Sequence, residues 1–249
     1  MTCKNRLWQL RETLPENLAR VQADGNAEIV LINYNSDDEL DEWVRRYREQ
    51  IDCGLLRYLH ERTARFIHLP KAKNLAHLGA TGEFLVNLDG DNFIGDTIQT
   101  WRALWTACHD TLIHGFCAET DAFCVGARDG KPADGNGTYG RIGLPRSHFI
   151  ALGGYDEEMP PASQEDVDLI DRARARGVNV VRSPQSGRAA IFNSIEERLQ
   201  YCGSTLTWQD MRRFAEQRRR ENLELGRITV NRGRSPAKVL LNFTEEIEL

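Results

Sequence analysis

The stretch Phe84–Asn92, which reads FLVNLDGDN, decides how this chain folds and where its chemistry lies. An apolar run typical of a buried strand leads directly into Asp89-Gly90-Asp91. Two carboxylates at the end of a strand share one edge of a sheet, where hard oxygen ligands suit a divalent cation and leave positions for a ligand's phosphates. The same residue types are common in plain turns, so the rest of the chain must decide between the two readings.

Other phosphate and cation motifs are excluded. A calcium loop of the EF-hand kind starting at Asp89 would need Asp or Asn at its fifth position and Gly at its sixth, where the chain has Phe93 and Ile94. The chain contains neither a Walker loop nor the glycine fingerprint of dinucleotide-binding folds. Any phosphates would therefore be held by a metal and by side chains.

Composition places the chain among globular proteins. Its 249 residues are 41% hydrophobic and 28% charged, which allows one large domain or one domain with an appendage. The net charge of -5 argues against a general nucleic-acid-binding protein. The sequence shows no apolar run of membrane-spanning length, no signal-peptide core and no CxxC pair among six cysteines, so we expect a cytoplasmic protein with reduced thiols.

Strand and helix patterns alternate along most of the chain. The expected helices cover Leu7–Val21, Leu40–Tyr47, Lys71–Ala80, Asp96–His109 and Gln164–Arg176, and the expected strands cover Glu28–Asn33, Leu55–Leu59, Arg65–Leu69, Glu83–Leu88 and Val178–Val181. This alternation predicts an α/β fold with a largely parallel sheet, in which ligands bind at the carboxyl ends of the strands. Residues 129–137 are rich in turn formers and are expected to form a mobile loop, a candidate lid.

The alternation ends beyond Glu197. Thr207 and Asp210 can cap a long helix that runs to about Leu225. We therefore predict one domain over residues 1–200 and a mainly helical appendage over residues 201–249. This appendage is rich in arginine, including Arg218-Arg219-Arg220, and offers either a solvated face or a contact for anionic lipid or a partner enzyme.

A second acidic cluster, Glu165-Asp166, follows the first by about 75 residues. Acids in the first turn of a helix complement its dipole and need no other role. Here, however, they follow Gly153-Gly154-Tyr155-Asp156, and the two clusters together supply one acidic site for a metal and another for a general base. Lys71, Lys73 and Asn74 lie where they could touch the donor of a group-transfer reaction, although exposed lysines there are commonly a solvated face.

The motifs, taken in order, resemble the GT-A glycosyltransferases, particularly the inverting family 2 type with a galactosyltransferase-like C-terminal segment. The resemblance covers roughly residues 2–200. It rests on Thr2–Arg6 with Leu10 and Thr13-Leu14, on Lys71–Ala76, Ala80–Glu83 and Asp89–Asp91, and on Gly153–Asp156 and Glu165–Leu169.

This resemblance implies a GT-A fold, with a Rossmann-like mixed, mostly parallel sheet flanked by helices and a helical C-terminal appendage. It implies a hexosyltransferase that takes a nucleotide-sugar donor, a UDP-sugar first of all, and transfers the sugar with inversion. Mn²⁺ or Mg²⁺ would be held by Asp91 directly, with Asp89 nearer the ribose or a metal-bound water. Asp166 would be the catalytic base, and Glu165 and Asp168 would orient the acceptor or the helix.

The same resemblance implies two sets of binding residues. Donor-binding residues would be Asn5, Arg6, Asn33, Lys71, Lys73, Asn74, Asp89 and Gly90. Acceptor-binding residues would be Gly153, Gly154, Tyr155, Glu165 and Asp168. The acceptor itself, whether a glycan, a lipid-linked sugar or a small molecule, and the oligomeric state are not readable from one sequence.

Three departures from the family pattern leave an alternative open. The first strand is curtailed, or the sequence is not the whole functional chain. Asn33, or the later Asp37, stands where relatives often place an Asp that reads uracil. Asn193 stands at the expected place of a late metal-binding His, since the last histidine is His148. These departures motivate a non-catalytic nucleotide- or carbohydrate-binding protein as the rival. A sugar-nucleotide pyrophosphorylase is disfavoured because its glycine-rich phosphate loop is absent.

Overall fold

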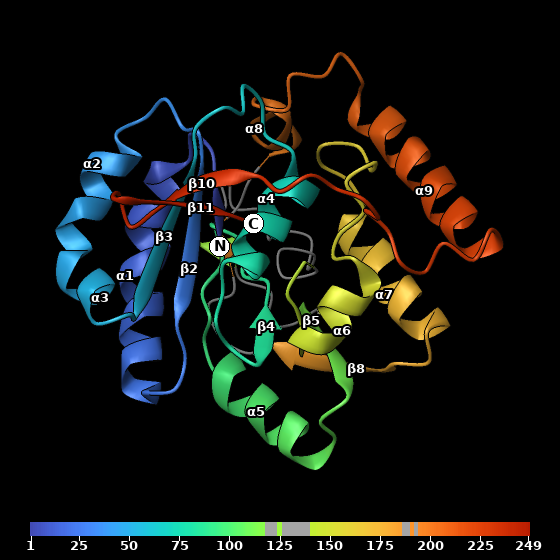
Figure 1. Cartoon of the computed structure of the whole chain (residues 1–249), viewed down its shortest axis with the longest axis horizontal. Helices are drawn as coiled ribbons and strands as arrows, with labels where there is room; N and C mark the ends of the chain where they lie inside the picture. The colour runs from blue at the N-terminus through green and yellow to red at the C-terminus, as the bar shows by residue number, and fades with distance from the viewer. Residues whose placement is uncertain (118–123, 126–139, 186–189, 192–193) are drawn as a thin grey trace.

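The computed structural model describes residues 1–117, 124–125, 140–185, 190–191 and 194–249, and it has a mixed α/β architecture (Figure 1). The strands are β1 (Thr2–Cys3), β2 (Ile29–Tyr34), β3 (Leu56–Glu61), β4 (Phe84–Val86), β5 (Thr111–Cys117), β6 (Cys124–Val125), β7 (Ile142–Pro145), β8 (Asn179–Gln185), β9 (Ala190–Ile191), β10 (Lys238–Leu241) and β11 (Glu245–Glu248). The helices are α1 (Leu7–Asp24), α2 (Leu40–Val44), the 3₁₀ turn η1 (Arg45–Tyr47), α3 (Arg48–Asp52), α4 (Leu69–Leu78), α5 (Thr97–Ala107), α6 (Arg146–Leu152), α7 (Glu165–Ala175), α8 (Ile195–Leu199) and α9 (Trp208–Glu224).

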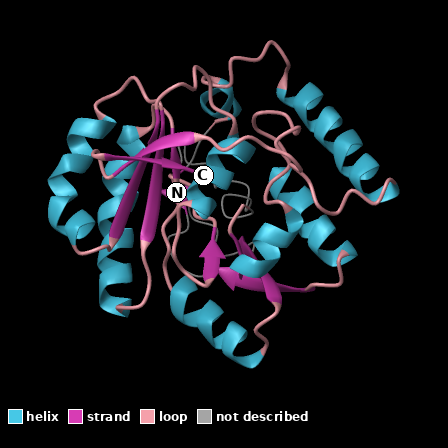
Figure 2. Cartoon of the chain, in the orientation of Figure 1, coloured by secondary structure: helices cyan, strands magenta, loops and turns pink. Residues whose placement is uncertain are grey.

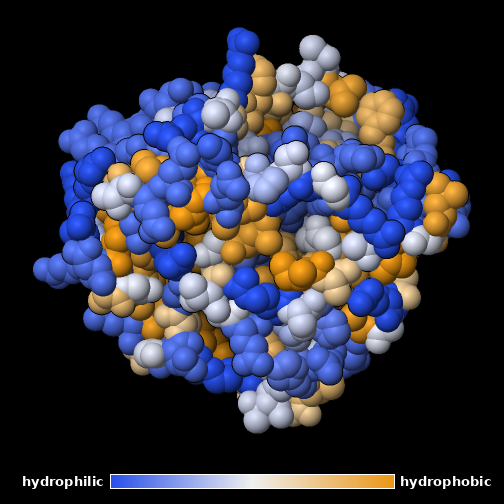
Figure 3. All heavy atoms as spheres, viewed as in Figure 1, coloured by the Kyte–Doolittle hydropathy of each residue, from blue (hydrophilic) through white to orange (hydrophobic). Residues whose placement is uncertain are grey.

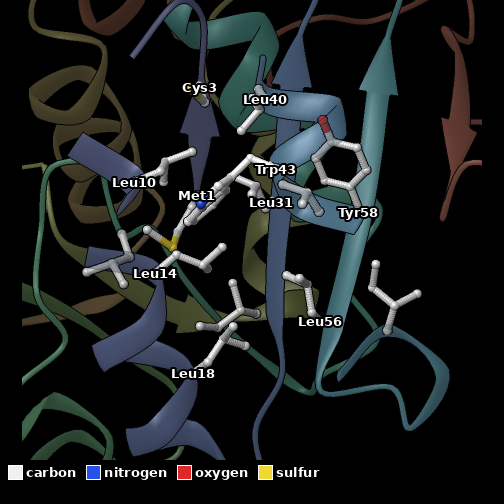
Figure 4. Packing of buried hydrophobic residues seen from close by; sticks show 14 of the residues in the cluster. Met1, Cys3, Leu10, Leu14, Leu18, Leu31, Leu40, Trp43, Leu56 and Tyr58 are labelled. Carbon is white, nitrogen blue, oxygen red and sulfur yellow. The ribbon is translucent and has the colours of Figure 1, made fainter. Parts of the chain in front are cut away.

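The first sheet has the order β1-β2-β3-β10-β11. Strands β1, β2 and β3 are parallel, and β10 is antiparallel to both β3 and β11. All six residues of β2 are buried, as its apolar sequence predicts for a central strand covered on both faces. On one face, Leu10, Leu14 and Leu18 of α1 point toward Leu31 of β2 (Figure 4). Their helical spacing places these leucines on one side of α1, and this apolar side forms the core.

The second sheet has the order β4-β7-β5-β8. Strand β7 is antiparallel to β4 and β5, and β5 is parallel to β8 (Figure 2). Its core joins Leu112 and Ile142 of the sheet to Phe149 of α6 and Leu169 of α7. This core fixes α7, and therefore the acids at its first turn, against the strand that precedes Asp89.

The C-terminal segment combines a helix with a hairpin. Helix α9 begins after Thr207 in a capping box with Asp210, which confirms the predicted helix. Strands β10 and β11 were not predicted from the sequence, and they extend the first sheet because Leu241 pairs with Leu59 of β3. The segment therefore covers the edge of β3 as well as the side of α7.

One expected strand is absent from the structure. Arg65–Leu69 is not a strand: it is an irregular connection that enters α4, whose first turn holds Pro70. Pro favours the first turn of a helix, where its missing N–H is not needed, and it disfavours a central strand. The predicted loop at residues 129–137 lies outside the described residues.

The surface carries polar and apolar side chains side by side. On the face shown in Figure 3, hydrophobic residues are interspersed among hydrophilic ones. Large exposed apolar residues include Trp8 on α1 and Leu225 just after α9. In the part of the chain that the structure describes, no helix combines the length and the apolar character needed to cross a membrane.

Candidate active site

Asp89 and Asp91 lie in the turn that follows β4, beside the first strand of the other sheet. A Cβ atom on Gly90 would lie 2.8 Å from the backbone oxygen of Thr2, so this position has no room for a larger residue. The Asn87 side chain donates to Asp89 Oδ1 at 3.0 Å and to the Gly140 carbonyl at 2.8 Å. The Asp-Gly-Asp turn is thus held between β1 and the segment that leads into β7.

The two carboxylates of this turn differ in their electrostatic environment. Burial opposes ionisation of Asp89, but the Lys73 ammonium, the Asn87 hydrogen bond and the charges of the N-terminus and Arg141 together outweigh it and lower the pKa of Asp89. Burial and the nearby Asp89 carboxylate raise the pKa of Asp91, although Asn92 donates to its Oδ1 at 2.8 Å. The ionised form of Asp91 is therefore disfavoured in the protein alone, and a bound cation would favour it.

Lys73, in α4, joins the two acidic clusters. Its Nζ lies 2.8 Å from Oε1 of Glu165 and 3.6 Å from Oδ1 of Asp89, and its side chain is 3% exposed. Burial alone would lower its pKa, but Asp89 and Glu165 raise it well above the usual range, so the ammonium stays charged. The same Nζ lies 5.4 Å from the centre of the Tyr155 ring. Lys73 is therefore a buried cation that is shared between the ends of β4 and α7.

Asp166 meets Asp89 across Gly140. A Cβ atom on Gly140 would lie 2.8 Å from Oδ2 of Asp89 and 3.5 Å from Oδ2 of Asp166, so both carboxylates face the same small space. Burial, followed by the charge of Glu165, raises the pKa of Asp166 to about 6. A carboxylate with this pKa accepts a proton far more readily than an ordinary aspartate does.

Residues of the predicted acceptor set, Gly153, Gly154 and Tyr155, form a tightly packed corner with Asn74. The Asn74 amide donates to the Tyr155 carbonyl at 2.9 Å and accepts from the Tyr155 N–H at 2.8 Å. Both glycines have positive φ angles, +74° and +72°, and a Cβ atom on Gly154 would lie 2.4 Å from Asn74 Oδ1. Asn74 therefore locks the chain ahead of α7, with its amide used inside the protein.

Asp168 is fully buried in α7. Its Oδ2 accepts from Arg172 Nε at 2.6 Å, and its Oδ1 accepts from the Asn222 amide at 3.0 Å. Arg172 in turn donates to the carbonyls of Leu152 and Gly154 at 2.9 and 2.8 Å. Of the two roles predicted for Asp168, these contacts favour orientation of the helix over contact with an acceptor.

A pocket of about 510 Å³ lies at the carboxyl ends of β1, β2 and β3. Its lining residues are Lys4, Asn5, Asn35, Asp37, Thr63, Ala64, Arg65, Phe66, Gln200 and Tyr201. Two of these residues, Asn5 and Asp37, are joined by a pair of hydrogen bonds. Asn5 Nδ2 donates to Asp37 Oδ2 at 3.3 Å, and the Asp37 N–H donates to Asn5 Oδ1 at 2.6 Å. The pocket occupies the edge of the sheet where α/β folds bind ligands.

Of the predicted donor-binding residues, only Asn5 belongs to this lining. Besides Lys73, Asn74 and the Asp89-Gly90 turn described above, Asn33, Arg6 and Lys71 also lie outside it. The Asn33 amide donates to Asp41 at 3.0 Å and accepts from the Ser36 N–H at 2.7 Å, so it shapes the loop that carries Asp37. Arg6 donates to the Glu197 carbonyl at 2.8 Å, on α8, and its charge acts on Asp91. Lys71 is exposed on the outer side of α4.

Two residues of the site escaped the sequence analysis. Gly140 carries no motif, and only the fold shows that it separates Asp89 from Asp166. Gln164 precedes Glu165 with a left-handed backbone, φ 53°, which Gly or Asn would have signalled and Gln does not. Asn193, predicted as a weak metal ligand, lies outside the described residues.

A divalent cation fits Asp89 and Asp91 in part. Both offer hard oxygen ligands, and a cation would offset the burial and the Asp89 charge that raise the pKa of Asp91. Within the described ranges, however, no three His, Cys, Asp or Glu side chains are grouped so as to hold a metal ion. A cation at this turn would therefore need further oxygen ligands from a bound phosphate.

Comparison with known proteins identifies the family. A family model described as glycosyl transferase family 2 matches residues 1–143, which is more than half of the chain. The chain belongs to glycosyl transferase family 2. Its GT-A fold and its assignment as a glycosyltransferase are thereby confirmed. The comparison with curated proteins finds no match.

Solved glycosyltransferases share the fold at low identity. The mannosyltransferase PcManGT from Pyrobaculum calidifontis, in complex with GDP-Man and Mn²⁺, aligns with a TM-score of 0.59 and 16% identity over 90% of this chain and 68% of its own. TarS 1-349 from S. aureus in complex with UDP aligns with a TM-score of 0.56 and 15% identity, over 91% of this chain and 71% of its own. GalNAc-T7 with UDP, GalNAc and Mn²⁺ aligns with a TM-score of 0.58 and 17% identity, over 91% of this chain and 50% of its own. The likeness shows the shared fold alone.

Proposed function

We propose that this family 2 glycosyltransferase transfers a sugar from a nucleoside-diphosphate donor to an acceptor hydroxyl, with inversion at the anomeric carbon. The observation that carries the proposal is the approach of Asp89 and Asp166 across Gly140. It places a carboxylate suited to a cation and diphosphate beside a carboxylate suited to accept a proton. The family membership favours this catalytic role over a non-catalytic binding protein.

The pocket at the carboxyl ends of β1, β2 and β3 is the proposed site of the nucleoside. Asp37 places a carboxylate on the lining, and Asn5 and Asn35 place amides there. Asn5 and Asp37 bond each other and the Asn35 amide donates to the Ala64 carbonyl at 3.1 Å, so a base would use the remaining donor and acceptor positions of these groups. A UDP-sugar is the proposed donor, with Asp37 rather than Asn33 reading the base, because Asp37 lines the pocket whereas Asn33 lies outside it and bonds Asp41 and the Ser36 N–H. Neighbours with the same fold are described with UDP, UDP-GlcNAc and GDP-Man, so guanine is the base to compare.

The diphosphate would lie between this pocket and Asp91. Arg6 comes from the end of β1 and Arg198 from α8, and the charges of both act on Asp91. Two guanidinium groups near a carboxylate favour a ligand that carries phosphates together with a cation. Mn²⁺ or Mg²⁺ held by Asp91, with Asp89 beside it, would neutralise the charge that develops on the leaving diphosphate.

Asp166 is the proposed base. With a pKa of about 6 it is ionised at neutral pH and close to the range in which a base is effective. The acceptor hydroxyl gives its proton to Asp166 while its oxygen forms a bond to the anomeric carbon. The bond from that carbon to the diphosphate oxygen breaks on the opposite face, so the nucleoside diphosphate leaves with the bonding electrons and the configuration inverts.

Two measurements test this function. Thermal shifts with UDP, GDP, UDP-galactose, UDP-GlcNAc and GDP-mannose, each with and without Mn²⁺, should show stabilisation of about 2.7 kcal/mol for the true donor at 100 times its Kd. Asp91→Asn should remove the Mn²⁺-dependent part of that shift. Asp166→Asn should keep the shift and lower transfer by about 100-fold or more.

The proposal fails on either of two results. If no nucleotide gives a metal-dependent shift, a non-catalytic binding protein is favoured. If Asp166→Asn transfers sugar at the wild-type rate, Asp166 is not the base.

A further inference from the structure

Gln164 has a backbone conformation that its side chain does not favour. It precedes α7 with φ 53° and ψ 15°, in the left-handed region. The other described non-glycine residues with positive φ are Asn5, Asn35, Asn231, Asn242 and Phe243. Asn tolerates this region through local hydrogen bonds, whereas a longer side chain there is destabilised by about 1 kcal/mol or more. Such a conformation persists only where the surroundings impose it.

Residues of helix α9 hold Gln164 in this left-handed conformation. Gln164 Nε2 donates to Glu216 Oε1 at 3.0 Å, and Gln164 Oε1 accepts from Arg219 Nη1 at 3.0 Å. Both ends of the amide are therefore held by residues of one helix that lies more than 50 positions later in the chain. Arg219 also lies 3.3 Å from Asp171 of α7, so the same guanidinium holds the body of the helix as well as its start.

Helix α9 is itself fixed against the segment before α7. Its inner side carries Met211, Ala215 and Asn222, all buried. Asp156, at 1% exposure, accepts from Arg218 Nε at 2.8 Å and from the Asn222 amide at 2.9 Å. The support for Gln164 is thus a packed helix with buried polar anchors.

The position of Gln164 decides where the site carboxylates point. Its carbonyl accepts the first helical bond, from the Asp168 N–H at 3.0 Å. Glu165, next in the chain, reaches Lys73, and Asp166 faces Asp89 across Gly140. A rotation at residue 164 would swing both carboxylates, and errors of about 1 Å at a reacting group can lower a rate by about 100-fold.

We propose that Gln164, held by hydrogen bonds with Glu216 and Arg219, is a positioning residue through which helix α9 fixes the orientation of the Asp166 carboxylate. The inference rests on the proposed function of Asp166 as the base. It gives α9 a part in the chemistry without contact to substrate. It also gives Arg219, which the sequence offered as a surface cation, a role in holding Gln164 and Asp171.

The test compares Gln164→Gly, Gln164→Ala and the control Gln217→Ala in the full chain. Glycine adopts the left-handed conformation freely, so Gln164→Gly removes the grip while leaving the fold stable. Gln217 is a glutamine of α9 whose amide makes an exposed bond to Glu221 at 2.9 Å. We expect kcat to fall about 10- to 100-fold for both Gln164 variants, with donor KM within twofold of wild type, and no change for Gln217→Ala. Glu216→Gln, which keeps an oxygen acceptor for Gln164, should retain more activity than Glu216→Ala.

Wild-type kcat in Gln164→Gly would overturn the proposal, as would a loss of kcat that only follows a loss of folded protein. Hydrogen exchange provides a readout that does not need activity. The amide of Asp168, which bonds to the Gln164 carbonyl, should exchange faster in Gln164→Gly than in wild type or Gln217→Ala, and unchanged protection there would also count against the proposal. If wild-type protein transfers no sugar from any donor, the proposed function fails, and the exchange result still decides whether α9 holds the start of α7.

Discussion

The ammonium of Lys73 lies 2.8 Å from the carboxylate of Glu165, 92 positions later in the chain, and both side chains are almost fully buried. The same ammonium lies 3.6 Å from Asp89. One cation therefore balances acids from two motifs that are far apart in the sequence. Because these charges are taken out of water together, each depends on the others for its stability.

Lys73→Met should destabilise the protein strongly. Removal of Lys73 leaves the buried Glu165 and the partly exposed Asp89 without their cation, and the loss of one partner of a buried ion pair costs about 3–5 kcal/mol. Urea unfolding measures the change. Lys71→Met provides a matched control on the same helix, since Lys71 is exposed, and its change should stay within about 0.5 kcal/mol. Equal effects for the two lysines would contradict the shared role of Lys73.

Gly140→Ala should abolish transfer with little loss of stability. The added methyl would lie 2.8 Å from Asp89 Oδ2, a flexible side-chain atom, so the carboxylate must move while the backbone need not. We expect kcat to fall about 100-fold or more and the melting temperature to change by only a few degrees. Initial rates at saturating donor, with the melting curve of the same preparation, measure both. Wild-type kcat in this variant would show that the space between Asp89 and Asp166 is not used.

The rate of transfer should depend on the ionisation of Asp166. Burial and Glu165 raise its pKa to about 6, and only the ionised form accepts a proton. Therefore kcat should fall tenfold for each pH unit below this pKa and level off above it. A profile from pH 4.5 to 8.5 at saturating donor and metal would show this, with folded protein confirmed at each pH. A rate that is flat from pH 5 to 7 would exclude Asp166 as the titrating group.

The arginines of α9 should differ sharply in their importance. Arg218 lies 2.8 Å from the buried Asp156 and 2.7 Å from Glu158, whereas Arg220 is exposed. We expect Arg218→Ala to destabilise the protein by about 1–3 kcal/mol and Arg220→Ala by less than about 0.5 kcal/mol. Thermal unfolding compares them.

A vesicle sedimentation assay with anionic lipid then tests the surface role that the sequence left open. Binding that Arg220→Ala weakens, with its stability intact, would support a lipid contact through the exposed side of α9. Because Arg218 and Arg219 pair with Asp156, Glu158 and Asp171, neutralising them would confuse loss of fold with loss of binding.

Local patterns predicted most of the helices and the central strands. The apolar spacing of α1, the buried run of β2 and the Thr207 capping box each follow from a short window of sequence. The pairing of two acidic clusters was also expected, because strands and helix starts in α/β folds converge at one edge. These features are local, or follow from a general rule of topology.

The remaining features depend on long-range partners. Lys73 and Asn74 were expected to touch a donor, and only the fold shows that Lys73 is an internal cation and that Asn74 clamps Tyr155. Gly140 and Gln164 carry no pattern, since their importance comes from what lies beside them in space. The hairpin of β10 and β11 was missed because each strand has only four residues, and three of the four in β11 are glutamates, a residue type that is depleted in strands.

The pairing of β10 with β3 has a consequence for how the chain reaches its fold. The Tyr58 N–H bonds to the Asn242 side chain, 184 positions later, at 2.9 Å. The edge of β3 therefore stays open during synthesis until residues 238–248 have emerged from the ribosome. An open edge of this kind can pair with strands from other chains. Contacts between residues so far apart in the sequence also form slowly. Truncation before Lys238 should yield a protein that aggregates, even though every residue proposed here for catalysis would still be present.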